Sequence, residues 1–169
     1  GALTHFIVEP FCAHTAQEEL YISATTTQQE DILHISTTGG VNIEEQWDSV
    51  HTIALSLTLS EDDVLDALQT SITSAFPDVA TLPDFAVGFY RFFKALHFSY
   101  LELNPFLLKE DNVYLLDAVA RLDDTALFLM QDDWGPEINF PSPFGLKAQT
   151  PEEKEIDRLD KESGASLKL

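Results

Sequence analysis

The sequence is poor in cysteine and in basic residues. Cys12 is the only cysteine among 169 residues, so an internal disulfide is impossible and a reducing, cytoplasmic location is expected. Lysine and arginine together number 9 against 29 aspartates and glutamates, which gives a formal net charge of −20 at pH 7. A surface of this charge repels phosphate backbones and anionic lipids, so we expect no nucleic-acid partner and no membrane partner.

Long apolar runs are also missing. No stretch approaches the roughly 20 apolar residues that cross a membrane, and the first residues lack the positive charge that begins a signal peptide. Hydrophobic residues still make up 44% of the chain, enough to fill a core and to exclude wholesale disorder. The length suits one ordinary domain.

The few basic residues are unevenly placed. No lysine or arginine precedes Arg91, whereas fourteen acidic residues lie between Glu9 and Asp84. A polyanionic ligand bound by this part would need a metal ion, backbone N–H groups or another segment. For most of the acids, a solvated surface is the simpler explanation.

Runs of β-favouring residues predict strands in the first third of the chain. Residues 19–27 and 32–37 flank a polar turn at 28–31, which indicates a β-hairpin. Shorter runs at 5–8 and 53–59 predict two further strands.

Two amphipathic helices are expected next. Ser60 is a capping hydroxyl followed by three acids, and the apolar spacing predicts a helix that ends near Pro77. Pro83 begins a second helix, in which apolar, mostly aromatic residues repeat at helical spacing from Phe85 to Leu96. Such a stripe is far more often core than a ligand site, so we expect it to be buried. Strands and helices together predict an α/β (α+β) fold.

The last part of the chain differs in composition. Four prolines between residues 136 and 151 indicate an extended connector. Thr150 then caps a helix that we expect to run to about Glu162. Residues 165–169 have the pattern of the first residues of a strand, and a strand without a partner is unstable alone. We therefore expect a piece of a longer chain.

A second predicted hairpin carries the most informative polar residues. Two strand-like runs, 98–108 and 113–119, are separated by four residues, and this loop length places Asn104 opposite Asp117. Glu102 lies on the same face as Asn104, because strand side chains repeat every two residues. Two carboxylates and an amide oxygen are thus expected in one patch, although a one-residue slip in register would separate them.

Asp117 interrupts an otherwise apolar strand. Burial of an unpaired carboxylate is unfavourable, so we expect a partner for it. Oxygen ligands of this kind suit Mg²⁺, which takes one or two protein oxygens and completes its shell with water and phosphate. The alternative is an Asn–Asp hydrogen bond at the end of a strand.

Two smaller signals have common structural explanations. Cys12 and His14 could form half of a metal site, but a buried thiol and a structural histidine are the simpler expectation. Gly39–Gly40 could approach a phosphate, but we expect the pair to form a turn.

The hairpin residues support a resemblance to a known family. Tyr100–Pro105 and Val113–Asp117 resemble the metal-binding hairpin in the ATP-grasp subunit of succinyl-CoA synthetases. Other segments, spread over nearly the whole chain, are similar to the ATP-citrate lyase family in particular. They include residues 6–11, 39–41, 43–48, 134–135, 140–145 and 163–169.

This resemblance implies the C-terminal part of an ATP-grasp fold, with a mixed or antiparallel sheet and flanking helices. Residues 1–135 would be the latter portion of the ATP-grasp domain. Residues 136–169 would be a connector, a helix and the start of a domain that binds citrate and coenzyme A. The implied reaction converts citrate, coenzyme A and ATP into acetyl-CoA, oxaloacetate, ADP and phosphate, through a phosphorylated histidine.

The resemblance also implies site residues. Glu9, Glu102, Asn104 and Asp117 match nucleotide-binding positions. Asn104 and Asp117 match the ligands of Mg²⁺–ATP, with Glu102 behind them. A second implied metal site comprises Asp160, Ser163 and Ala165.

Other parts of the implied reaction lie outside this sequence. In the family, the lysine, arginine and glycine that hold the phosphates would lie upstream of Gly1, and the citrate and coenzyme A sites downstream of Leu169. The phosphorylated histidine belongs to another domain or subunit, so none of the five histidines is assigned to it, and no catalytic residue is expected here. We therefore expect partners that carry these sites, an oligomer in the full enzyme, and little or no turnover by this chain.

Two alternatives stay open at this point. The β subunit of a succinyl-CoA synthetase shares the phosphoryl step but does not cleave citrate. A non-catalytic assembly module would instead make subunit contacts through exposed apolar residues of the 85–96 helix and leave the carboxylates solvated.

Overall fold

The structure is a computed structural model, and its chain divides into two compact units by internal contacts. The smaller unit is Gly1–Pro10 with Glu137–Leu169, and the larger is Phe11–Pro136. The residues that the structure describes are 6, 8–41, 43–110, 112–135 and 150–163.

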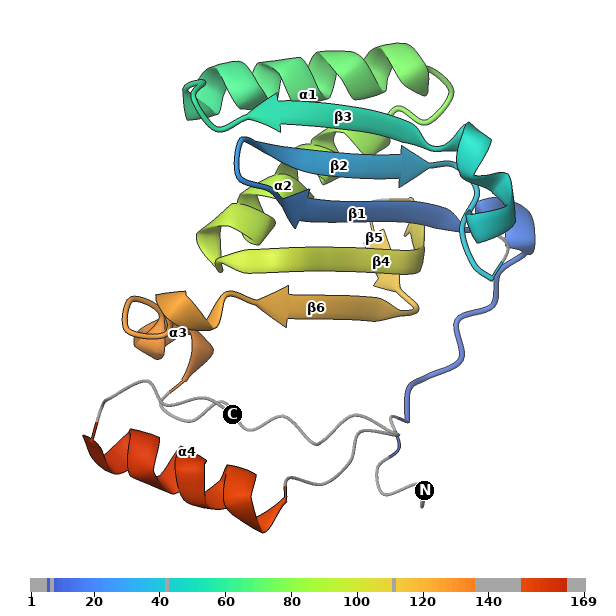
Figure 1. The fold of residues 1–169 in the computed structure, drawn as a ribbon. Helices are drawn as coiled ribbons and strands as arrows, with labels where there is room; N and C mark the ends of the chain where they lie inside the picture. The colour runs from blue at the N-terminus through green and yellow to red at the C-terminus, as the bar shows by residue number, and fades with distance from the viewer. Residues whose placement is uncertain (1–5, 7, 42, 111, 136–149, 164–169) are drawn as a thin grey trace. The chain divides into compact units, whose positions relative to one another are not determined.

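Six antiparallel strands form one sheet in the larger unit (Figure 1). Their order is β3-β2-β1-β4-β5, and β6 also pairs with β4. The bounds are β1 Leu20–Thr26, β2 Glu30–Ser36, β3 His51–Ser56, β4 Phe98–Lys109, β5 Asn112–Leu115 and β6 Ala118–Leu122.

The first predicted hairpin is confirmed, but its turn is shorter. β1 and β2 pair from Tyr21↔Ser36 to Thr26↔Asp31, so Asp31 belongs to the strand and not to the turn. The turn is closed by Thr27, whose backbone N–H donates to the Glu30 carbonyl at 2.9 Å.

Two other strand predictions need correction. β3 begins and ends earlier than the 53–59 run, because His51 already pairs with Ile35 and the last pair is Ser56 with Glu30. In the predicted strand at 5–8, the described residues Phe6 and Val8 lie outside any strand and are 76% and 93% exposed. β-favouring residues alone do not form a strand, because a strand needs a neighbour for its backbone hydrogen bonds.

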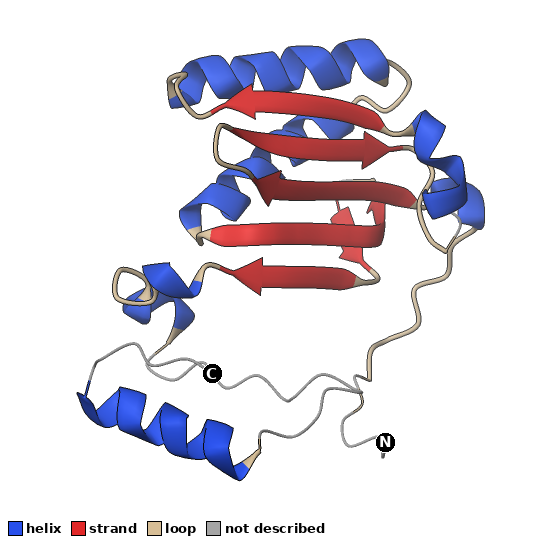
Figure 2. Ribbon diagram, viewed as in Figure 1, coloured by secondary structure: helices blue, strands red, loops and turns tan. Residues whose placement is uncertain are grey.

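Helices α1 (Glu61–Ala75) and α2 (Leu82–Ala95) cover one face of the sheet (Figure 2). Ser60 caps α1 as predicted, since its Oγ accepts the Asp63 N–H at 3.2 Å. The buried residues of α1 are the predicted apolar face, namely Val64, Leu65, Leu68 and Ile72.

The aromatic stripe of α2 is mostly core, as predicted. Phe89 and Phe93 are buried, and Phe85 stacks on Phe106 of β4 at a ring distance of 4.6 Å. Phe92 is the exception, because 51% of it is exposed beside Phe98. One such residue offers little apolar surface, so the structure gives scant support to an assembly module built on this helix.

Short helical turns complete the larger unit and were not predicted. They are η1 (Ala16–Glu18), η2 (Ile43–Ser49), η3 (Asp124–Ala126) and α3 (Gln131–Trp134). Tertiary contacts fix such turns; the Trp134 indole N–H, for example, donates to the Leu96 carbonyl at 3.1 Å.

The smaller unit contains α4 (Pro151–Ser163), whose start at Thr150 is as predicted. The Thr150 N–H donates to Glu153, and the Glu153 N–H donates back to the Thr150 hydroxyl, at 2.6 and 3.2 Å. The predicted connector and the strand at 165–169 fall largely or wholly outside the described residues. Among the helices that the structure describes, none has the length and apolar character needed to cross a membrane.

Candidate functional site

The second predicted hairpin has the expected register. Leu108 pairs with Val113, and Leu103 pairs with Ala118, which is the same offset along both strands. The turn is tighter than expected, because Lys109 also pairs with Asn112. The loop length therefore fixed which residues face each other across the hairpin.

The strand opposite β4 is interrupted, whereas the sequence predicts one continuous strand. β5 ends at Leu115 and β6 begins at Ala118. In the gap, the Pro105 carbonyl accepts the N–H groups of both Leu116 and Asp117, at 3.1 and 3.3 Å. The cis Asn104–Pro105 peptide bond lies at the same point of β4.

Asn104 and Asp117 lie beside each other at this interruption. The Asn104 N–H donates to the Asp117 carbonyl at 3.1 Å. Asp117 is exposed, which corrects the expectation of a buried acid that needs a partner. In the gap between β5 and β6 the Asp117 carboxylate is solvated, and its oxygens can bind a cation.

The Asn104 side chain is oriented by a distant loop. Its Oδ1 accepts the N–H of Gly40 at 2.7 Å, and Gly40 follows β2 with a φ of +80°. Gly39–Gly40 therefore lies in a bend as predicted, and its backbone also reaches the site. An amide oxygen has two lone pairs, so one is left for a further ligand.

A second segment packs against the same loop. A side chain at Gly40 would collide with the Glu19 carboxylate, and the Glu19 Oε1 lies 3.2 Å from the His14 Nε2. The His14 Nδ1 lies 2.8 Å from the Cys12 carbonyl, so His14 is a structural histidine as expected, while Cys12 is only partly buried. The sequence pattern did not predict that Gly40 lies between Glu19 and Asn104, because both contacts join residues that are distant in sequence.

Glu102 lies in β4 two residues before Asn104 and is half-buried. Its Oε2 accepts hydrogen bonds from the hydroxyls of Tyr100 at 2.5 Å and Tyr21 at 3.3 Å. Burial, reinforced by Glu102, raises the pKa of Tyr100 above its ordinary value, so this phenol stays protonated and donates. The two phenols hold the carboxylate in place.

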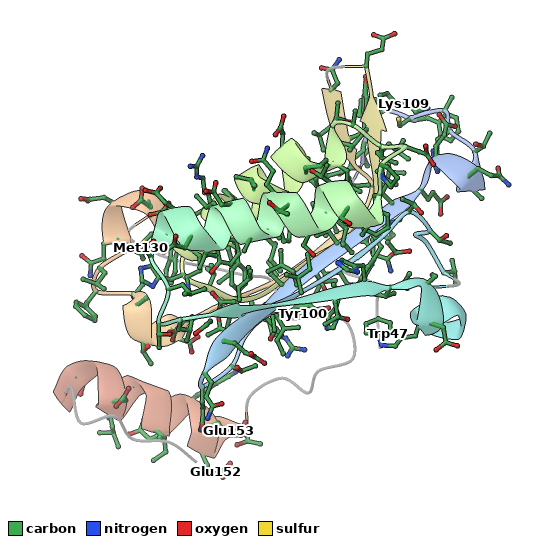
Figure 3. All side chains as sticks on the ribbon, turned by 90° about the horizontal axis from the view of Figure 1, so that it is seen from above. Trp47, Tyr100, Lys109, Met130, Glu152 and Glu153 are labelled. Atoms are coloured by element: carbon green, nitrogen blue, oxygen red, sulfur yellow. The ribbon has the colours of Figure 1, made fainter. Side chains whose placement is uncertain are left out.

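Glu102 and its two phenols lie on the face of the sheet away from α1 and α2, because their neighbours Leu101 and Leu103 belong to the core under the helices. Figure 3 shows Tyr100 and Trp47 on that side. Trp47 is 48% exposed and packs against Tyr21 and His34, with ring distances of 6.4 and 5.0 Å. Burial lowers the pKa of His34, which favours its neutral form. This face is therefore polar and aromatic, unlike the apolar face under the helices.

The tip of the hairpin is tied to the segment before β1. The Lys109 Nζ lies 2.8 Å from a Glu18 carboxylate oxygen and donates to the Ala13 carbonyl at 2.8 Å. The hydrogen bond from Lys109, followed by those from Thr15, lowers the pKa of Glu18 to about 2. These contacts hold the segment that contains His14 beside the hairpin.

The other predicted site residues are less informative. Glu9 is exposed and belongs to the smaller unit. Asp160 lies half-buried in α4, Ser163 is the last residue of that helix, and Ala165 lies outside the described residues. Within the described part of the chain, no cluster of three or more histidines, cysteines or acids is arranged to hold a metal. These assignments stay predictions, as does the coordination of Mg²⁺ by Asn104 and Asp117.

The donor set at the hairpin is chemically suited to Mg²⁺. One carboxylate and one amide oxygen are hard ligands, and Mg²⁺ commonly takes so few from the protein. The Gly40 N–H that holds Asn104 provides the supporting contact that ligand residues usually have.

Comparison with known proteins identifies a family over most of the chain. The sequence model described as the ATP-citrate synthase ATP-grasp domain matches residues 1–134. A probable ATP-citrate synthase of Caenorhabditis elegans is 39% identical over 180 residues, covering 100% of this chain and 16% of that protein. ATP-citrate synthase alpha chain protein 1 of Arabidopsis thaliana is 39% identical over 177 residues, covering 100% of this chain and 39% of that protein.

Solved structures agree with the sequence comparison. ATP citrate lyase from Methanosaeta concilii, in a mutant form bound to (3S)-citryl-CoA, is 28% identical with a TM-score of 0.73. The enzyme from Methanothrix soehngenii, bound to citrate and coenzyme A, is 30% identical with a TM-score of 0.68. Each match covers 95% of this chain and 36% of the other.

The chain thus spans well under half the length of the relatives it matches. The match to ATP citrate lyases supports the expected α/β architecture, with its antiparallel sheet and flanking helices. With a family model over residues 1–134 and whole-chain relatives at 39% identity, the chain belongs to the family of ATP-citrate synthase ATP-grasp domains.

Proposed function

We propose that this chain is part of the ATP-binding portion of an ATP-citrate synthase and that it holds Mg²⁺–ATP at Asn104 and Asp117. The observation that carries the proposal is the hairpin register, which sets these two residues side by side, with the Asn104 oxygen fixed by Gly40. An acidic loop that is only solvated would need neither this register nor the hydrogen bond from Gly40 to Asn104.

In this proposal the residues act by binding and orientation. Mg²⁺ supplies positive charge that neutralises the phosphates as charge develops during phosphoryl transfer. Asn104 and Asp117 provide its protein ligands, and Gly40 keeps the Asn104 oxygen aimed at it. Glu102, fixed by Tyr21 and Tyr100, adds negative charge behind the ligands. Glu9 contacts the nucleotide.

The whole reaction of the family is part of the same proposal. ATP phosphorylates a histidine on a partner domain or subunit, and citrate and coenzyme A then give acetyl-CoA and oxaloacetate, with release of ADP and phosphate. Two related solved enzymes are described as complexes with citryl-CoA or with citrate and coenzyme A, which supports these substrates. The chain contributes the nucleotide site and acts within a larger, oligomeric enzyme in the cytoplasm.

The remaining assignments complete the proposal. Residues 1–135 form the latter portion of the ATP-grasp domain, and residues 136–169 lead to the domain that binds citrate and coenzyme A. A second metal site near the end of the chain comprises Asp160, Ser163 and Ala165. The succinyl-CoA synthetase β subunit is the less favoured reading, because the family match and the relatives described above are ATP-citrate synthases or lyases.

Titration calorimetry on the full-length protein tests the metal ligands. We expect Asp117→Ala and Asn104→Ala each to weaken Mg²⁺–ATP binding by about 10- to 100-fold, with a much smaller effect on ATP in the presence of EDTA. Asp66→Ala, which removes an exposed acid from α1, is the matched control and should bind as the wild type does. Equal affinities in all four proteins would exclude the site.

A further inference from the structure

The helical side of the sheet contains a cavity that the nucleotide proposal does not use. Its volume is about 470 Å³, which lies within the range of small-molecule sites, ~300–1,000 Å³. It lies where β3 ends, α1 begins and α2 ends (Figure 1). Gly40, which contacts Asn104, follows the end of β2 that pairs with the start of β3, so the cavity is at the opposite end of the sheet.

Most of the cavity wall is apolar. Of the residues that line it, Val64, Leu65 and Tyr90 are buried, and Leu57 and Leu59 are 44% and 50% exposed. The Tyr90 hydroxyl already donates to Asp31 at 2.8 Å, so its ring is what the cavity meets. Two leucines left half-exposed beside a hollow would gain from covering by an apolar group.

The lining of the cavity includes two of the chain's nine basic residues. Arg91 and Lys94 are three residues apart on α2 and therefore neighbours on the helix surface. The Arg91 Nε lies 4.0 Å from Glu61, with the two side chains 60% and 76% exposed, and such a pair contributes little. The Lys94 ammonium has three N–H donors, and the Asp31 carboxylate takes one at 2.8 Å.

The residues that line the cavity carry two positive charges and one negative charge, in a chain whose net charge is −20. Arg91 lies near Glu61, and Lys94 pairs with the buried Asp31. Asp62 and Asp63 follow Glu61 in α1 but are not among the lining residues. A carboxylate meets cationic N–H donors here, which are scarce on the rest of this acidic surface, and it can replace the weak contact of Arg91 with Glu61.

From these features we infer that the cavity binds a small amphiphilic monocarboxylate, with its apolar body on Leu57, Leu59 and Leu65 and its carboxylate on Arg91 and Lys94. This site is independent of the nucleotide proposal. The cavity lies on the helical face, where β3 ends, whereas Asn104 lies at the opposite end of the sheet.

Octanoate, kept below its micellar concentration, is the probe. In ¹H–¹⁵N NMR titrations of the 169-residue chain, we expect saturable shifts at Leu57, Leu59 and Arg91. 1-Octanol should bind about tenfold more weakly, the loss of a charge-assisted hydrogen bond, and octylamine more weakly still. Shifts that do not saturate, shifts elsewhere, or octylamine binding as tight as octanoate would overturn the inference.

Variants locate the carboxylate. Arg91→Gln should weaken octanoate binding about tenfold and leave 1-octanol binding unchanged, because only the charged contact is lost. Arg121→Gln is the matched control, since this arginine lies over the Tyr100 ring on the other face, and it should bind octanoate as the wild type does. Equal octanoate affinity in Arg91→Gln and wild type would contradict the assignment of the carboxylate to Arg91. The comparison of octanoate, 1-octanol and octylamine is made on the wild-type chain, so it tests the inference even if the variant fails to fold.

Discussion

Two acidic residues of the same sheet have opposite surroundings. Asp31 on β2 points under the helices and is 0% exposed, and its carboxylate accepts hydrogen bonds from Thr26, Tyr90 and Lys94 at 2.7–2.8 Å. Glu102 on β4 points to the other face, is half-buried and is held by two phenols. Asp31 has a lysine as its ion-pair partner, whereas Glu102 is held by uncharged phenols near the proposed ligands. The first arrangement serves stability, and the second leaves charge for binding.

Removing the buried acid should have the largest effect on stability. Asp31→Ala leaves the buried Tyr90 hydroxyl without its acceptor and the Lys94 ammonium, whose side chain is 44% exposed, without its ion-pair partner. We expect a loss of about 2–3 kcal/mol in the free energy of unfolding. Urea denaturation followed by tryptophan fluorescence measures it. Asp66→Ala is the exposed control and should change stability by less than about 0.5 kcal/mol. A loss below about 1 kcal/mol in Asp31→Ala would remove the contrast between the two faces.

Replacing each of two glycines by alanine should change the stability with opposite sign. Gly40→Ala puts a side chain at a φ of +80° and against the Glu19 carboxylate, so we expect a loss of about 1–3 kcal/mol. Gly88→Ala, in α2 with open space around it, should instead add up to about 1 kcal/mol through helix propensity. The same urea experiment measures both, and a neutral Gly40→Ala would mean that the loop beside Asn104 adapts freely.

Neutralising Glu102 should leave the stability nearly unchanged and should shift the pKa of Tyr100. Glu102→Gln should cost no more than about 1 kcal/mol, because the amide oxygen still accepts a hydrogen bond. Burial and then Glu102 raise the pKa of Tyr100, so removing the negative charge should lower that pKa toward the ordinary value. ¹³C NMR of the tyrosine rings during alkaline titration follows it. An unchanged Tyr100 pKa would mean that the carboxylate does not act on this phenol.

The smallest expected effect concerns the exposed ion pair at the hairpin tip. The pKa of Glu18 is lowered from 4.5 to about 2, chiefly by Lys109. The stabilisation is therefore fully present above pH 4.5 and is lost as the pH falls from 4.5 to about 2. Glu18→Gln should flatten the pH dependence of stability in that interval, and Lys109→Gln should do the same. Because the pair is exposed, added salt should reduce the wild-type slope.

The hairpin site could be predicted because its geometry is local. Strand alternation and loop length fix which residues face each other, and these rules placed Asn104 opposite Asp117. The interruption at Pro105 was missed, because an apolar run gives no sign that one carbonyl accepts two N–H groups. Asp117 was consequently expected inside a strand, and it is exposed instead.

Long-range contacts were beyond the reach of sequence patterns. Gly40 and Asn104 are 64 residues apart, and Asp31 and Lys94 are 63 apart. Asp31 was assigned to a polar turn, because nothing near it in sequence supplies the lysine that permits its burial. Both cases required the fold, which brings the loop after β2 beside β4 and places α2 over β2.

The position of β5 at the end of the sheet has a consequence for colloidal behaviour. Val113, Tyr114 and Leu115 are 41–53% exposed on a strand with no lysine or arginine within it. Edge strands of this kind pair with those of other molecules unless something keeps the molecules apart. At neutral pH the charge of −20 does so, and it vanishes as the carboxylates are protonated. Electrostatic repulsion between these acidic chains therefore also opposes their self-association. On acidification, solutions should become turbid at a higher pH than the pH at which the helices unfold.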